Sequence, residues 1–186
     1  MSPKTSMVYW ESLRVPLFGG KEIFLAATER GLCRITWPQE AYEVLRAWAD
    51  KRWPDAAWIR NGGRIAEYAG QMASYFEGTR QAFDIPLDLR GTEFQVAVWR
   101  RLARIPYGEC RSYSEIAREI GRPAAVRAVS AAVGANPLSI VVPCHRVLGK
   151  NGALTGFRGG LQAKEALLRL EGFEAFSAKG HARFRF

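Results

Sequence analysis

The chain has 186 residues, of which 48% are hydrophobic, and a formal net charge of +9 at pH 7. Three widely spaced cysteines exclude a disulfide framework and favour a reducing compartment, and no run approaches the roughly 20 apolar residues of a membrane span. No Cys or His pair has zinc-site spacing, and the first residues lack the apolar run with a basic lead that is typical of a signal peptide, so we expect a cytoplasmic protein without a metal. The positive charge attracts polyanions, but charge alone leaves a nucleic-acid partner undecided.

The first part of the chain is typical of a small sheet with helices. Three short segments rich in Val, Ile, Leu, Phe and Trp are predicted as strands, at 7–16, 22–27 and 31–37, with turns at Gly19-Gly20 and Arg30-Gly31. Apolar residues then recur at helical spacing, first around Tyr42–Trp48 and more clearly from Ile65 to Phe76. Residues 77–91 contain Gly, Pro and Asp and are interpreted as a linker.

The second part is predicted to be mainly helical. Thr92 with Gln95 forms a capping box for a helix that Pro106 ends, and Ser112 with Glu115 forms another for a short helix through Ile120.

Pro123 suits the first turn of a next helix, predicted to run to about Gly134. Two short helices across a turn with a glycine, Gly121, are typical of a helix-turn-helix, although many helical proteins contain such corners. The expected class is therefore α+β, with a supporting α/β domain at 1–85 and a winged helix-turn-helix domain at 86–186.

One face of that last helix carries almost only methyl groups. Its members recur at helical spacing and are Ala124, Arg127, Ala128, Ala131 and Ala135. An alanine face permits close approach of another body, and a single arginine on it can reach between bases or to a phosphate. Packing against a neighbouring helix, with Arg127 extended to water, is the alternative that the pattern favours slightly.

The chemical centre is predicted around Cys144. A buried β run is expected to end at Pro143, directly before Cys144 and His145. An imidazole can take the proton of a thiol, although neighbours on a flat strand point to opposite faces. The residues alone leave open a buried structural Cys-His pair, a DNA-binding module and a cysteine hydrolase, of which DNA binding ranks first. Against a cysteine hydrolase, the sequence has no evident oxyanion-hole glycine motif just before Cys144.

The sequence resembles the methylated-DNA–protein-cysteine methyltransferases, also called O6-alkylguanine-DNA alkyltransferases. The resemblance covers about residues 90–173 with nearly continuous spacing. The segments that carry it are Pro143-Cys144-His145-Arg146-Val147, Asn136-Pro137, Tyr113-Ser114, Arg127-Ala128-Val129, Gly159-Gly160-Leu161, Lys164 and Leu170-Glu171-Gly172.

The resemblance implies a role for each matching residue. Cys144 corresponds to the cysteine that accepts the alkyl group, once per molecule and without a cofactor. His145 corresponds to the histidine that deprotonates it through a water, and Glu171 to the carboxylate that orients the imidazole. Asn136 corresponds to the asparagine that shapes the active-site turn, and Tyr113 to the tyrosine that helps protonate the leaving guanine.

The resemblance also implies the partner, which is double-stranded DNA contacted through the minor groove, with the alkylated guanine flipped out. Arg127 would fill the gap that the base leaves, and the helix surface around it would touch DNA through Ala124, Ala128, Ser130 and Ala131. The substrate pocket would include Val147, Phe157, Arg158 and Gly159. The implied protein is a monomer that also acts on O4-alkylthymine.

Two departures from the family pattern lie in the expected pocket. Phe157 stands where many members have Tyr, and Arg158 where some have a small residue such as Ser. Ser130 replaces a glycine of some members. These differences affect pocket size and tolerance for bulky alkyl groups, and none removes a catalytic group. A damage sensor of the same fold would lack the acceptor cysteine, which is present here.

Overall fold

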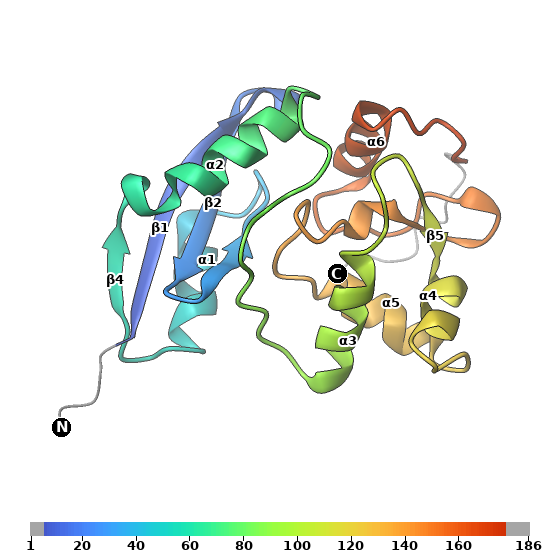
Figure 1. Ribbon diagram of the computed structural model, residues 1–186, viewed down its shortest axis with the longest axis horizontal. Coiled ribbons are helices and arrows are strands. Elements are labelled where there is room, and N and C mark those ends of the chain that lie inside the picture. The colour runs from blue at the N-terminus through green and yellow to red at the C-terminus, as the bar shows by residue number, and fades with distance from the viewer. Residues whose placement is uncertain (1–5, 178–186) are drawn as a thin grey trace. The chain divides into compact units, whose positions relative to one another are not determined.

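The computed structural model describes residues 6–177, and the chain divides into two compact units, Met1–Leu89 and Arg90–Phe186 (Figure 1). The α+β class expected from the sequence is confirmed. The sequence-based boundary fell after residue 85, and the first unit extends four residues beyond it. Within the described part of the chain, no helix is long and apolar enough to cross a membrane.

A four-stranded mixed sheet forms the centre of the first unit. Its strands are β1 (Met7–Val15), β2 (Lys21–Thr28), β3 (Gly31–Ile35) and β4 (Ala57–Arg60), in the order β3-β2-β1-β4. The first three strands are antiparallel neighbours joined by short turns, the first of which includes the 3₁₀ helix η1 (Pro16–Phe18). The fourth strand runs parallel to β1, which requires the longer connection through α1.

Helices cover the sheet because both of its faces are apolar. On one face Val8, Ala26 and Cys33 pack with Leu45 of α1 (Tyr42–Asp50). The alternate residues of β2, such as Ile23 and Leu25, point to the other face, since successive side chains of a strand alternate. Helix α2 (Gly62–Phe76) packs against β1 and β2, and Figure 1 draws it in front of the sheet.

The segment after α2 is attached to the sheet edge. Leu32 donates its backbone N–H to Pro86 and its carbonyl accepts from Asp88, both at 2.8 Å. The Asp88 carboxylate also accepts from the Thr28 hydroxyl at 2.8 Å. Gly31 is required here, because a Cβ at its φ of +140° would lie 2.1 Å from the Pro86 carbonyl oxygen. Residues 86–88 therefore belong to the first unit, and interpreting all of 77–91 as a linker was wrong.

The second unit is mainly helical. Its elements are α3 (Glu93–Leu102), β5 (Arg111–Ser112), α4 (Tyr113–Glu119), α5 (Val126–Gly134), η2 (Cys144–Arg146), β6 (Val147–Leu148), η3 (Lys150–Gly152) and α6 (Leu161–Leu170). The short strands β5 and β6 pair in parallel. Both capping boxes expected from the sequence are confirmed, with the side chains of Thr92 and Ser112 accepting from the backbone of Gln95 and Glu115.

Two helix boundaries differ from the prediction. Helix α3 ends at Leu102, because the chain tightens into i→i+3 hydrogen bonds before Pro106. Helix α5 begins at Val126 rather than Pro123, because the Ala125 N–H donates to the Arg122 carbonyl in a preceding turn. Ala124 consequently lies in the turn between α4 and α5 and not on the helix.

Candidate active site

Cys144 lies in an irregular segment, and the predicted β run before it was wrong. Residues 137–142 form turns with one isolated bridge between Ser139 and Val142, and Ile140 has a φ of +80°. The Cys144 N–H donates to the Val142 carbonyl at 2.8 Å, and the 3₁₀ helix η2 follows, in which the Arg146 N–H donates to the Pro143 carbonyl at 3.0 Å. Cys144 and His145 thus lie on one tight helical turn and not on opposite faces of a strand.

Asn136 holds the turns that precede the cysteine. Its side-chain amide donates to the Val142 carbonyl at 2.8 Å, and its carbonyl oxygen accepts from the Leu138 N–H at 2.9 Å. Asn136 is buried, so both polar ends of its side chain are used within the turn. The Cys144 thiol lies 3.7 Å from the Ser139 hydroxyl, to which it donates. The segment therefore fixes where the sulfur points.

A buried charged cluster adjoins the cysteine at the end of α6. The Glu171 carboxylate lies 2.8 Å from Nε2 of His145 and accepts from Nε and Nη2 of Arg146, each within 2.9 Å of one of its oxygens. It also accepts from the Gly108 N–H at 3.1 Å, and Arg146 donates further to the Ile105 carbonyl. The side chains of His145 and Glu171 are fully buried.

The ionisation of the cluster follows from these partners. Burial opposes the charge of Glu171, but the hydrogen bonds from His145 and Arg146 outweigh it and lower the pKa of the carboxyl to about 2. Burial lowers the pKa of His145, against the opposing effect of Glu171. The carboxylate is therefore balanced by Arg146, and a neutral imidazole donates from Nε2. The other ring nitrogen, Nδ1, is then the basic one.

The Cys144 thiol is nearly enclosed, with 4% of the residue exposed. Burial raises the pKa of Cys144, while hydrogen bonds with Asn136 and Ser139 and the charge of Lys164 act in the opposite direction. The free protein thus needs a base at the moment when the sulfur reacts. All three cysteines are free, and burial raises the pKa of Cys110 to about 12, which makes that thiol unreactive.

Tyr113 begins α4 directly after β5, and its ring is largely buried. Its hydroxyl accepts from the Thr155 hydroxyl at 3.2 Å. Burial raises the pKa of Tyr113, against the hydrogen bond from Thr155, and the charge of Cys144 acts in the same direction as burial. Tyr113 is therefore a protonated phenol at neutral pH.

The expected pocket residues follow η2 along the chain. Val147 is fully buried, and its carbonyl accepts from the ammonium of Lys164 at 2.6 Å. That ammonium lies 5.8 Å from the centre of the Phe157 ring. Arg158 and Gly159 are half-buried, and burial lowers the pKa of Arg158. A phenyl ring and a guanidinium thus lie in the same loop.

The alanine surface of the helix-turn-helix faces outward. Arg127, Ala128, Ser130 and Ala131 of α5 are exposed, as is Ala124 in the turn before it. The opposite side of α5 packs through Val129 and Val133, which are buried. Since the alanine surface is exposed, the alternative of helix packing on that side is wrong within the part of the chain that the structure describes.

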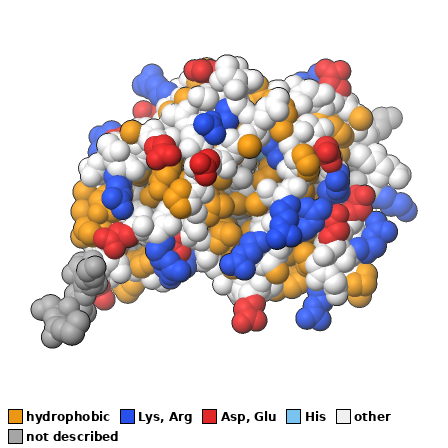
Figure 2. All heavy atoms as spheres, viewed as in Figure 1, with side chains coloured by type: hydrophobic (Ala, Val, Ile, Leu, Met, Phe, Trp, Pro, Cys, Tyr) orange, Lys and Arg blue, Asp and Glu red, His pale blue; other side chains and the backbone are white. Residues whose placement is uncertain are grey.

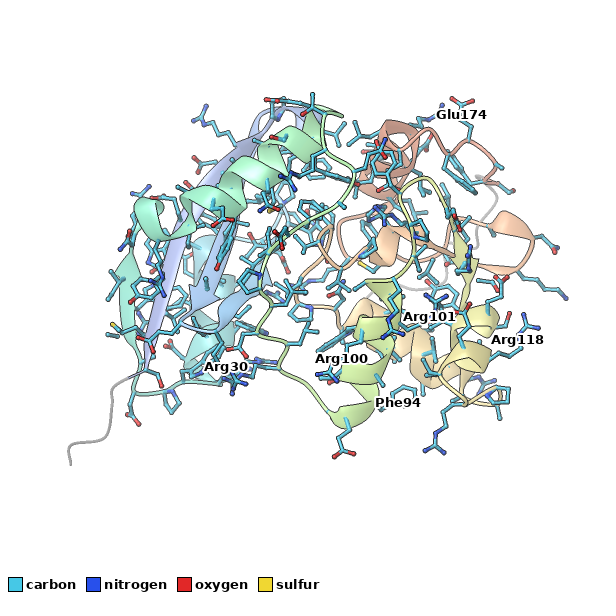
Figure 3. All side chains as sticks on the ribbon, in the orientation of Figure 1. Arg30, Phe94, Arg100, Arg101, Arg118 and Glu174 are labelled. Carbon is cyan, nitrogen blue, oxygen red and sulfur yellow. The ribbon has the colours of Figure 1, made fainter. Side chains whose placement is uncertain are left out.

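The second unit also carries positive charge on α3 and α4. Figure 2 shows a run of Lys and Arg side chains on the face drawn, and Figure 3 labels Arg100, Arg101 and Arg118 there. Arg101 is engaged by Glu119 at 2.7 Å, whereas Arg100 and Arg118 are exposed. Exposed arginines of this kind suit a phosphate backbone.

The sequence did not reveal the supporting roles of Arg146, Lys164, Ser139 and Thr155. The sequence pattern does distinguish Lys164, because this charged residue lies on the apolar stripe of α6 with Leu167 and Leu168. A lysine at such a position is buried, and its pKa is lowered by burial to about 8. Arg146 lies in the segment that carries the resemblance, although no role was assigned to it, and Ser139 and Thr155 show no pattern that separates them from surface residues.

Each of the two units matches a family model of known proteins. Residues 8–89 match the family model described as 6-O-methylguanine DNA methyltransferase, ribonuclease-like domain, and residues 93–173 match its DNA binding domain. The inducible methylated-DNA–protein-cysteine methyltransferase of Bacillus subtilis is 45% identical over 92% of this chain and 94% of its own. That of Mycolicibacterium paratuberculosis is 57% identical over 79% of this chain and 84% of its own.

A solved structure from Mycobacterium tuberculosis, crystallised in complex with DNA, has a TM-score of 0.75 and 40% identity. The match covers 88% of this chain and 92% of that one. Both domain models, the identity over most of the chain and the shared fold lead to one conclusion. The chain belongs to the 6-O-methylguanine DNA methyltransferase family, the methylated-DNA–protein-cysteine methyltransferases.

Proposed function

We propose that Cys144 is the acceptor through which this chain repairs O6-methylguanine and related O6-alkylguanines in DNA. The repair activity is that of the family, and the assignment of residues is ours. One observation carries it: Cys144 is followed, on the same 3₁₀ turn, by His145, a buried imidazole whose Nε2 lies 2.8 Å from the Glu171 carboxylate. A held, neutral imidazole is suited to take a proton through Nδ1.

The proposed step forms a bond between the Cys144 sulfur and the alkyl carbon and breaks the bond from that carbon to guanine O6. The thiol proton passes through a water to Nδ1 of His145, so that the sulfur attacks as thiolate. Tyr113, a protonated phenol, donates to the leaving guanine, and the proton on His145 replaces it through solvent. In sum, the thiol proton ends on the restored guanine.

The charged cluster supports this proton transfer without entering it. When His145 gains a proton, Glu171 is ionised and already aligned with Nε2, so the new imidazolium is stabilised at once. Arg146 holds the carboxylate from its other side and prevents it from turning away. Glu171 is thus a positioning residue for His145.

The DNA contact is proposed to run through α5. The relative from Mycobacterium tuberculosis is seen in complex with DNA, and damaged DNA is the corresponding partner here. The exposed methyl surface of Ala124, Ala128 and Ala131, with Ser130 among them, lets the minor groove approach closely, and Arg127 fills the space of the flipped guanine. Flipping costs roughly a few kcal/mol, which these contacts offset. One chain suffices for the reaction, so a monomer is the acting form.

The product is a thioether on Cys144, and no group described in residues 6–177 is placed to hydrolyse it. Each chain therefore acts once. Phe157 offers a ring to flank the flipped guanine without a hydroxyl, and Arg158 contributes the polar part of the pocket mouth. O4-alkylthymine is proposed as a second, smaller substrate of the same pocket.

The test follows a labelled methyl group from DNA to protein. Incubation with a duplex that carries O6-[³H-methyl]guanine is expected to give one label per chain in the wild type, and none in Cys144→Ala. Cys110→Ala is the matched control and should be labelled as fully as the wild type. Equal labelling of Cys144→Ala, or shift of the duplex in a gel without any transfer, would refute the proposal.

A further inference from the structure

Thr155 contacts the phenol of Tyr113, and nothing in the proposed reaction yet uses this contact. The Thr155 hydroxyl donates to the Tyr113 oxygen at 3.2 Å. A phenol O–H prefers the ring plane, where it has two positions. A donor on one side of the oxygen disfavours that position for the phenol proton, because two protons would then meet. The contact therefore selects the direction in which Tyr113 donates.

The orientation of Thr155 is itself fixed from two sides. A Cβ on Gly149 would lie 2.6 Å from the Thr155 methyl carbon, so that methyl group lies closely against the glycine backbone. With the methyl group fixed, the staggered geometry of a β-branched side chain sets the hydroxyl in the remaining direction. Packing thus supports the hydrogen bond to Tyr113 in setting the contact geometry.

The backbone of Thr155 is fixed as well. The buried ammonium of Lys164 donates to the carbonyls of Val147 and Thr155, at 2.6 and 3.3 Å. Lys164 therefore joins β6 to the start of the Phe157 loop. Because β6 pairs with β5, and α4 begins with Tyr113 directly after β5, both ends of the Thr155–Tyr113 contact belong to one hydrogen-bonded assembly.

We propose that Thr155 is a positioning residue for Tyr113, which aims the phenol proton at the leaving guanine during alkyl transfer. The inference rests on the proposed function, since it assigns Tyr113 the role of proton donor. The Thr155 hydroxyl contacts the phenol, so its effect falls on the leaving group and not on the nucleophile.

The test uses full-length protein in single-turnover transfer from a methylated duplex, with three variants. Thr155→Val keeps the shape and removes the hydroxyl, Thr155→Ser restores a hydroxyl, and Tyr113→Phe removes the phenol. We expect Thr155→Val to slow transfer about 5- to 20-fold, the effect of one lost or misdirected hydrogen bond. Thr155→Ser should recover the rate to within about threefold, while the affinity for the damaged duplex stays unchanged in both.

The double variant separates positioning from a structural role. If Thr155 acts through Tyr113, Thr155→Val in the Tyr113→Phe background slows transfer no further, because there is no phenol proton left to aim. A further loss of the same size in that background would overturn the inference, as would a wild-type rate for Thr155→Val.

The melting temperature of each variant shows whether a slow transfer rate results from loss of the fold. If Thr155→Val is destabilised, Thr155→Ser still decides, because a rate that falls as far as in Thr155→Val despite a restored hydroxyl contradicts the proposal. Absence of label on the wild type would instead refute the proposed function itself, so the two failures are distinguishable.

Discussion

Replacement of Glu171 by Gln tests the buried cluster most directly. The substitution keeps the shape of the side chain and removes the charge that faces Arg146, whose side chain is only 7% exposed. Removing one partner of a buried pair leaves an unpaired charge and typically costs about 3–5 kcal/mol. The variant should lose that much free energy of unfolding at neutral pH.

The pKa of Glu171 gives a second route to the magnitude. It falls from 4.5 to about 2 on folding, and such a difference corresponds to about 3 kcal/mol at neutral pH. Because the folded pKa is the lower one, this contribution is fully present above pH 4.5 and is lost as the pH falls toward about 2. Both arguments give a contribution of about 3 kcal/mol. The free energy of unfolding of Glu171→Gln should not show this fall at acid pH.

The assay is urea unfolding of the free protein at pH 7 and at steps down to pH 3, with Glu165→Gln as the matched control. Glu165 pairs with Arg169 on the same helix at 3.0 Å, but both side chains are exposed, so its loss should cost about 0.5 kcal/mol or less. Equal stability of the two variants at pH 7, or an unchanged acid slope in Glu171→Gln, would refute the reasoning.

Three further substitutions have distinct expected outcomes. Asn136→Ala removes two buried hydrogen bonds, so the free energy of unfolding in urea should fall by about 2–3 kcal/mol and methyl transfer should slow. An unchanged transfer rate would mean that the turn does not place the sulfur. Arg127→Ala should weaken duplex binding in a fluorescence titration and reduce its salt slope by about 1, with unfolding unchanged; equal affinity would exclude α5 from the interface. Lys164→Met should slow iodoacetamide labelling of Cys144 below about pH 8, where the charged ammonium of Lys164 favours the thiolate; the rate is followed against pH with peptide mapping. Since Lys164 loses its own charge above about pH 8, the two profiles should converge at higher pH, and a constant gap would contradict its electrostatic role.

Local patterns predicted the regular elements because their determinants are local. The capping boxes at Thr92 and Ser112 depend on residues three apart, and both form as expected. The first three strands follow from their apolar composition and their turns, within two residues, whereas β4 was not predicted. By contrast, the attachment of residues 86–88 to β3 depends on a pairing partner more than 50 positions away, which no local pattern records.

The candidate site divides in the same way. The resemblance supplied the candidate catalytic residues, and the structure brings two of them, His145 and Glu171, together at 2.8 Å. The residues that hold them were not predictable, because their contacts are backbone carbonyls and side chains brought close only by folding. Lys164, for example, binds two carbonyls from segments 9 and 17 residues away.

The error about the segment before Cys144 has a physical cause that bears on the reaction. Most residues at 138–142 are apolar and resemble a buried strand, but the hydrogen bonds of Asn136 to Leu138 and Val142, together with that from the Val142 N–H to the Leu138 carbonyl, close them into turns. This conformation includes Ile140 at a φ of +80°, a strained position for a β-branched residue that costs of order 1–3 kcal/mol. A strand would avoid that cost, but it would direct Cys144 and His145 to opposite faces. The 3₁₀ turn that follows instead lets the thiol point toward Ser139 while the next imidazole reaches Glu171. The strain is therefore tolerated where it places Cys144 and His145 on one turn, as the proposed proton transfer requires.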